Sequence, residues 1–229
     1  MQDTCIKFFH QSTCDKVVSA DKLRIHARGP VWHRQHQKLG IIPKGLTGLD
    51  TAASWSYRKS DGWVYGPGTF CRVACRNRIR GVFKWMRNRA HEAKRLWLET
   101  GQLKGLITTG LMDSKAADQA LFFQRQRQRR ILLLTTTRQG TDKSPARKRM
   151  IKGLTQRKNK RLYKQRSYTV EPMQGLVKDI FDLETCWMRG NANNRWLLAA
   201  MGVVVHMHQY QAWQEARSTW AITQEVLGR

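Results

Sequence analysis

Acidic residues are scarce in this 229-residue chain: 16 Asp and Glu stand against 42 Lys and Arg, which leaves a net charge of +26. Long apolar runs are also missing, because the longest, Trp196–Val205, has ten residues where a membrane-spanning helix needs about 20. The five cysteines are odd in number and scattered, and the N-terminus lacks the basic flank and apolar stretch of a secretion signal. With only five prolines and 41% hydrophobic residues, a fibrous or disordered chain is excluded. The composition predicts a folded cytoplasmic protein that neither spans a membrane nor is secreted.

Positive charge is concentrated in one part of the chain. Between Arg125 and Arg166 there are 16 Lys and Arg residues against one acid, Asp142. So dense a run exceeds what solubility requires and favours a polyanionic partner, with nucleic acid first and a membrane surface second. We expect phosphate contacts from six residues of this segment: Arg147, Lys148, Arg149, Arg157, Lys158 and Lys160.

Both ends of the chain lack a clear pattern. Residues 1–45 show no hydrophobic periodicity, which predicts a loosely structured N-terminal segment, and residues 216–229 are read as a C-terminal tail. Cys5, His10, Cys14 and His26 offer zinc ligands, but they lack the C-x-x-C spacing of a zinc knuckle. We therefore do not expect these four residues to form a zinc site.

Residues 46–215 alternate between strand-like and helix-like patterns. Strands are predicted at Leu46–Leu49, Gly62–Val73 (interrupted by Gly66, Pro67 and Gly68), Gly81–Met86, Leu103–Met112 and Ile131–Thr137. Helices are predicted at His91–Thr100, Ser114–Leu121, Val170–Phe181 and Asn194–Glu215. This order predicts an α/β domain, a mixed sheet flanked by helices.

Three of the few acids stand where they can meet. Asp50 and Asp113 each follow a predicted strand, and Glu171 lies on the polar face of the Val170–Phe181 helix. We prefer Asp113 to Asp118 because Asp118 falls inside the predicted helix that follows. Clustered carboxylates in a basic chain are what divalent cations need to hold a phosphodiester for in-line displacement.

These residues resemble a known family, the D-D-E transposases of bacterial insertion sequences, over roughly residues 45–215. The stretch YKQRSYTVEPMQGLVKD, from Tyr163 to Asp179, is similar to the tyrosine, arginine, glutamate, lysine signature of that family, with four residues between Arg166 and Glu171 instead of three. The segments GWVYG (62–66), MDSKAADQALF (112–122) and MRGNANNRWLLAAM (188–201) resemble its hairpin, its second acidic segment and its C-terminal helix.

The resemblance implies a ribonuclease-H-like catalytic domain that cuts and joins DNA strands at insertion-sequence ends. Asp50, Asp113 and Glu171 would hold two Mg²⁺ or Mn²⁺ ions, and Tyr163, Arg166 and Lys178 would contact DNA. The implied partners are element ends and target DNA, bound by a homodimer in the nucleoid.

Three other readings stay open. A nuclease of the same fold would share the carboxylates but make no joined product. A basic RNA-binding or structural protein would use the charge and not the acids. A truncated, inactive transposase remnant would keep the fold and bind DNA without turnover.

Overall fold

The computed structural model describes residues 16–58, 62–75, 81–88, 90, 92, 94–96, 98, 107–114, 131–136 and 145–219. The described strands are β1 (Val17–Arg24), β2 (Ser54–Arg58), β3 (Gly62–Gly66), β4 (Gly68–Ala74), β5 (Val82–Met86), β6 (Thr109–Met112) and β7 (Leu132–Thr135). The described helices are α2 (Arg34–Leu39), α5 (Pro145–Thr155), α6 (Arg157–Lys164), α7 (Val170–Phe181) and α8 (Asn191–Gln214). Residues 92, 94–96 and 98 are also helical.

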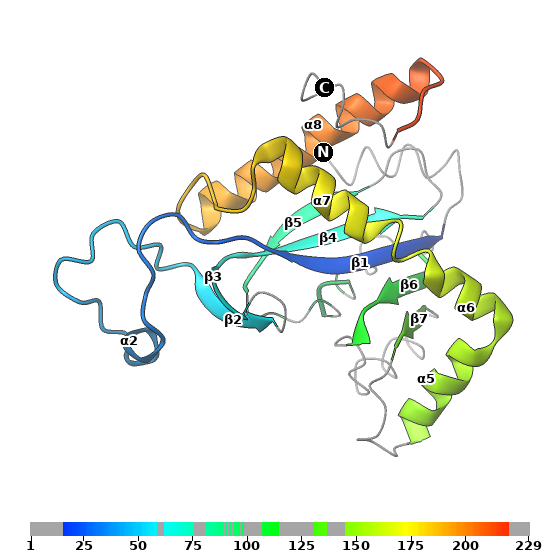
Figure 1. Ribbon diagram of the computed structural model, residues 1–229, viewed down its shortest axis with the longest axis horizontal. Coiled ribbons are helices and arrows are strands. Elements are labelled where there is room, and N and C mark those ends of the chain that lie inside the picture. The colour runs from blue at the N-terminus through cyan, green and yellow to red at the C-terminus, as the bar shows by residue number, and fades with distance from the viewer. Residues whose placement is uncertain are drawn as a thin grey trace.

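Five strands form one mixed sheet in the order β5-β4-β1-β6-β7 (Figure 1). β4 runs antiparallel to both β1 and β5, and β6 runs parallel to both β1 and β7. The central strand, β1, comes from residues 17–24, which the sequence placed in a loose lead-in. That expectation is wrong for β1 and for α2, and the domain therefore begins well before residue 46; residues 1–15, with three of the four zinc candidates, lie outside the described part.

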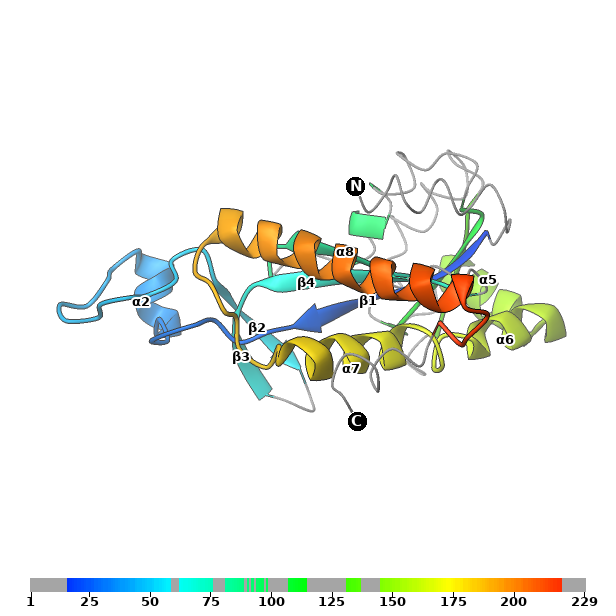
Figure 2. The ribbon, with the colours of Figure 1, turned by 90° about the horizontal axis from the view of Figure 1, so that it is seen from above.

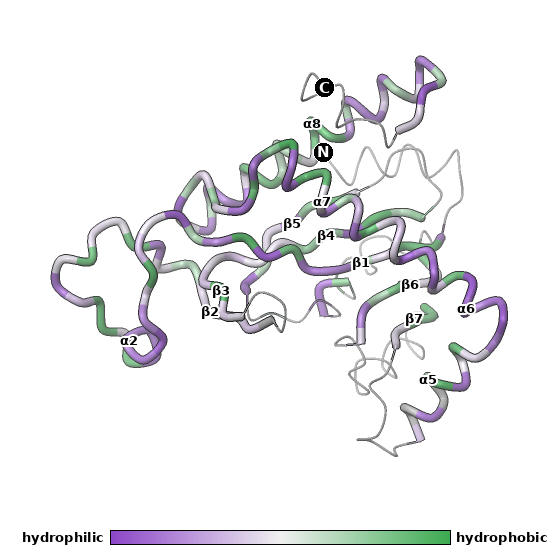
Figure 3. The backbone as a smooth tube through the Cα atoms, viewed as in Figure 1, coloured by the Kyte–Doolittle hydropathy of each residue, from purple (hydrophilic) through white to green (hydrophobic). Residues whose placement is uncertain are grey.

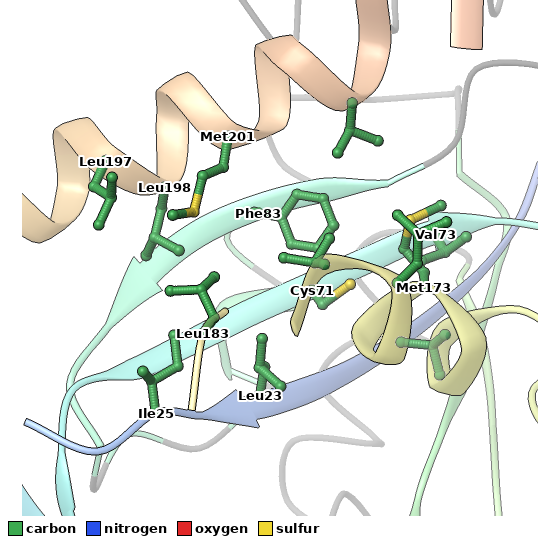
Figure 4. Close-up of a cluster of buried hydrophobic side chains, with 14 of the residues drawn as sticks. Leu23, Ile25, Cys71, Val73, Phe83, Met173, Leu183, Leu197, Leu198 and Met201 are labelled. Atoms are coloured by element: carbon green, nitrogen blue, oxygen red, sulfur yellow. The ribbon is translucent and has the colours of Figure 1, made fainter. Parts of the chain in front are cut away.

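One face of the sheet is covered by α7 and α8, which lie side by side across it (Figure 2). Leu23, Cys71 and Phe83 project from three neighbouring strands and meet Met173 of α7 and Met201 of α8 (Figure 4). The 3.6-residue spacing of apolar positions in α7 gives it one buried stripe, as the sequence predicted. Burial of this cluster fixes both helices over the β1–β4–β5 half of the sheet.

The β6–β7 half is covered by α5 and α6, a pair of helices in the basic segment. Leu154, Leu162 and Tyr163 pack against Leu111 of β6 and Leu134 of β7. Figure 3 shows α6 as largely hydrophilic, so its apolar side is narrow. The sequence reading of this segment as solvated and without periodicity is therefore wrong for residues 145–164; residues 125–130 and 137–144 lie outside the described part.

The opposite face of the sheet carries a separate apolar cluster. Its members come from all five strands, from the segment before β6, from the helical residues after β5 and from α5: Val18, Ala20, Phe70, Met86, Leu96, Ile107, Met112, Leu133 and Met150. Both faces of the central strand are thus buried, which explains why β1 has no clean alternation of polar and apolar residues.

Strands β2 and β3 form a two-stranded ribbon beyond the end of the sheet, beside α2 (Figure 1). The predicted break between two strands at Gly66–Gly68 is confirmed, since β3 ends at Gly66 and β4 begins at Gly68. Only glycine fits at position 66, because a Cβ there would lie 1.9 Å from the carbonyl oxygen of Ile25. This close approach ties the ribbon to the chain that leaves β1.

The expected strand at Leu46–Leu49 is absent, and these residues run through turns instead. The predicted strands Gly81–Met86 and Ile131–Thr137 are confirmed as β5 and β7, and the predicted helices Val170–Phe181 and Asn194–Glu215 as α7 and α8. The strand expected at Leu103–Met112 is confirmed over Thr109–Met112, while residues 103–106 and nearly all of the expected Ser114–Leu121 helix lie outside the described residues. Among the helices of the described part, none has the length and apolarity that a membrane crossing requires.

Candidate functional site

Asp21 lies in the middle of β1, the central strand. It pairs in register with Cys71 of β4, on the face covered by α7. Burial raises the pKa of the Cys71 thiol far above its ordinary range, and the negative charge of Asp21 raises it further. The strand therefore holds a carboxylate within a largely apolar layer.

Asp113 comes directly after β6, as the sequence predicted. β1 and β6 are parallel, with Ser19 opposite Leu111. Two residues further along each strand, Asp21 and Asp113 stand side by side. The register of the sheet thus brings together two acids that are far apart in the sequence.

Glu92 completes the group from the helical residues after β5. One carboxylate oxygen of each residue lies within 4.8 Å of those of the other two, and Glu92 is 8% exposed. Three carboxylates offer hard oxygen ligands, which suit Mg²⁺, Mn²⁺ or Ca²⁺ better than soft metals. This acidic group can hold a metal ion.

Arg166 links the acidic group to Glu171. Its Nη2 atom lies 2.5 Å from Oδ2 of Asp21, and its Nη1 atom lies 2.7 Å from Oε1 of Glu171. The side chains of Arg166 and Asp21 are 14% and 17% exposed, whereas that of Glu171 is 52% exposed. A single guanidinium therefore bridges a carboxylate of β1 and one in the first turn of α7.

Asp50, the first acid of the predicted trio, does not join this group. Its Oδ1 atom accepts a hydrogen bond from the Ala52 amide at 3.0 Å, and its Oδ2 atom accepts one from the Gly190 amide at 3.1 Å. Tyr65 donates its hydroxyl proton to the Asp50 carbonyl at 2.7 Å. Asp50 is a buried carboxylate that joins Gly190, just before α8, to the loop before β2. The expectation that Asp50 ends a strand next to Asp113 is therefore wrong.

The signature residues around Glu171 have distinct places. The Tyr163 hydroxyl lies 3.2 Å from the carbonyl oxygen of Met112, one residue before Asp113, so Tyr163 steadies the end of β6. Lys178 forms an ion pair with Glu184 at 2.9 Å, about two helical turns from Glu171. Arg166 contacts carboxylates rather than facing open solvent.

The basic residues of α5 and α6 face outward over the β7 edge. Lys148, Arg157, Lys158 and Lys160 are exposed, and α6 carries no acid. The side chains of Arg147 and Arg149 fall outside the described part. Both helices pack against β7, and Tyr163 of α6 reaches the Met112 carbonyl at the end of β6.

Sequence reasoning missed Asp21 and Glu92. In both cases the signal was weak: Asp21 lies in VVSADKLR, where burial on both faces hides the period of two, and Glu92 lies in a short helical stretch rich in Arg and Lys. Scarcity of acids was the usable signal, because a carboxylate inside a β-prone run of a basic chain is unusual. Comparison with known proteins adds no relative, since no family model, curated protein or solved structure matches this chain.

Proposed function

We propose that this chain is the ribonuclease-H-like catalytic domain of a D-D-E transposase, which cuts DNA at the ends of an insertion sequence and joins them to target DNA. The observation that carries the proposal is the meeting of Asp21, Glu92 and Asp113 within 4.8 Å, in a chain of net charge +26. Carboxylates are costly to place together unless a cation balances them. A basic surface suits the binding of a polyanion such as DNA, and clustered carboxylates suit its cleavage.

The sheet supports the fold part of the proposal. Three antiparallel strands, β5, β4 and β1, continue into the parallel strands β6 and β7. This is the mixed sheet flanked by helices that the resemblance implies, and the acids lie on its central strand, on the neighbouring strand end and at the start of α7.

The roles of the acids are revised from the sequence reading. Asp21 takes the place first given to Asp50, Asp113 keeps its role, and Glu171 supplies the acid of the signature. Glu92 adds a fourth carboxylate. Two Mg²⁺ or Mn²⁺ ions at these oxygens would polarise the scissile phosphate and lower the pKa of the attacking water or hydroxyl.

The remaining residues position the DNA and the ligands. Tyr163 holds the backbone beside Asp113, while the exposed cations of α5 and α6 bind the phosphodiester backbone. The first reaction is hydrolysis that frees a 3′-hydroxyl at the element end. That hydroxyl then attacks a target phosphodiester, forming one P–O bond as another breaks. We place this reaction in the nucleoid, with two copies assembled on DNA.

The test is strand cleavage and joining with purified chain, a duplex carrying the ends of the element that encodes it, and Mg²⁺ or Mn²⁺. Asp21→Asn and Asp113→Asn should abolish both products while DNA binding persists. Asp179→Asn, on the exposed side of α7, is the matched control. Asp50→Asn should retain cleavage per folded molecule because Asp50 binds backbone amides instead.

Each outcome selects one reading. Cleavage without joining assigns a nuclease, and DNA binding without either product assigns an inactive remnant. Full cleavage by both Asp21→Asn and Asp113→Asn would overturn the proposed site.

A further inference from the structure

The β2–β3 ribbon carries four aromatic rings on one face. Tyr57 pairs with Trp63 and Trp55 pairs with Tyr65 across the two antiparallel strands. Residues two apart on a strand share a face, so the rings form two successive cross-strand pairs. We name Trp55 and Tyr65 the inner pair and Tyr57 and Trp63 the outer pair.

The inner pair is part of the protein's own packing. It belongs to an apolar cluster with Trp32, and the Trp55 indole donates a hydrogen bond to the Trp32 carbonyl at 2.7 Å. The Trp32 indole in turn donates to the carbonyl of Ile41 at 2.9 Å. These contacts fix a ribbon that would be only marginally stable by itself.

The outer pair is exposed to solvent. Tyr57 is 55% exposed and Trp63 is 48% exposed, and their ring centres are 5.2 Å apart. The guanidinium carbon of Arg34, from α2, lies 3.7 Å from the centre of the Trp63 ring. Two aromatic rings and a cation therefore lie together at the protein surface, where the ribbon and α2 are neighbours (Figure 1).

The chain segment that supplies Arg34 is basic. Residues 25–49 contain Arg28, Arg34, Lys38 and Lys44 and neither Asp nor Glu. All four cations are exposed. A second copy of the same surface would bring like charges together, whereas a polyanion is attracted to it.

We infer that the outer pair and Arg34 form a binding site for an unpaired nucleotide, in which the base stacks on Tyr57 or Trp63 and a phosphate pairs with Arg34. Base stacking on aromatic side chains beside cations is how single strands are bound without sequence preference. A base inside a duplex is covered on both faces by its neighbours, so this site selects unpaired or end nucleotides. The inference goes beyond strand cleavage and uses none of the carboxylates.

The test measures binding in EDTA, so that the acidic group plays no part. Fluorescence anisotropy compares a labelled oligothymidine single strand with a labelled duplex of equal charge. Trp63→Leu should weaken single-strand binding by about 5- to 150-fold, the range for loss of one stacked base, and leave duplex binding nearly unchanged. Trp63→Phe, which keeps a ring, should retain most of the affinity and shows that the ribbon still folds.

Salt dependence separates the two parts of the site. Trp63→Leu should leave the salt slope of single-strand binding unchanged, because stacking releases no counterions. Arg34→Gln should flatten it by about 0.7, the value for one phosphate contact on a single strand. Trp196→Ala, which removes a 66% exposed ring from α8, is the matched control and should change neither quantity.

Three results would overturn the inference: equal losses on single strand and duplex, no loss with Trp63→Leu, or the same loss with Trp196→Ala. Sedimentation that shows a wild-type dimer lost in Trp63→Leu would assign the face to a second copy instead. If the wild-type protein binds single strands as expected but does not cleave DNA, the result would count against the proposed function and not against this site.

Discussion

Arg166 is a positive charge in direct contact with the acidic group, and Arg166→Met tests what it does there. The substitution keeps most of the side-chain length and removes the guanidinium. In the native protein that guanidinium contacts Asp21 at 2.5 Å and Glu171 at 2.7 Å. Without it, Asp21 stands next to Glu92 and Asp113 with less positive charge nearby.

The expected loss of stability comes mainly from the pair with Asp21. Breaking a buried ion pair costs about 3–5 kcal/mol, and a solvent-exposed pair contributes about 0–1 kcal/mol. The Arg166–Asp21 side chains are 14% and 17% exposed and the Glu171 side chain is 52% exposed, so the first pair lies near the buried case. We expect the free energy of unfolding in EDTA to fall by about 2–3 kcal/mol, which lowers Tm by about 4–12 °C for a chain of this size.

Metal binding should change in the opposite direction. A guanidinium beside a bound cation would repel it, and at an assumed separation of about 5 Å the repulsion per unit charge is about 1–3 kcal/mol, depending on the effective dielectric constant. Removing it should tighten Mn²⁺ binding at least about tenfold, since 1.4 kcal/mol is a factor of ten. Isothermal titration with Mn²⁺ and thermal unfolding with and without Mn²⁺ measure both effects.

The matched control is Arg217→Met, which removes an ion pair with exposed Glu215 beyond the end of α8. Neither Tm in EDTA nor Mn²⁺ affinity should change in that variant. Equal or weaker Mn²⁺ binding by Arg166→Met would refute the reasoning, because Arg166 would then not compete with a cation for Asp21 and Glu171.

Two further predictions concern the basic helix α6 and the raised pKa of the buried Cys186 thiol. Changing Lys158 and Lys160 to Gln should flatten the salt dependence of duplex DNA binding by about 1.8 in log–log slope; an unchanged slope in a filter-binding or anisotropy titration would place α6 away from DNA. Burial, with the charge of Asp50, raises the pKa of Cys186 from 9.0 to about 12. Because this pKa is higher in the folded protein than in the unfolded chain, the contribution of Cys186 to stability is complete below pH 9 and is lost as the pH rises towards 12. Cys186→Ala should therefore make the free energy of unfolding fall less steeply over this pH range, by about 1.4 kcal/mol per pH unit. Urea unfolding of the wild type and of Cys186→Ala between pH 9 and pH 12 measures this difference. The same pH dependence in both proteins would contradict the assignment to Cys186.

Several local features follow from the sequence by itself. The bounds of α7 follow from its apolar stripe, because the 3.6-residue period is a local property of the chain. The boundary between β3 and β4 follows from Gly66, Pro67 and Gly68, because a proline between two glycines disfavours a continuous strand. The position of Asp113 at the end of β6 and the net charge of +26 follow in the same way.

The composition of the site was decided by the tertiary structure. Arg166 and Asp21 are 145 residues apart in the sequence, and Asp50 and Gly190 are 140 residues apart, so neither pairing leaves a local pattern. Asp50 and Asp21 are each preceded by apolar residues, and only the register of β1 with β6 distinguishes the acid that meets Asp113. Hydrophobic periodicity reports which side of an element is buried, whereas the partner of a buried carboxylate depends on which strands are neighbours and in what register.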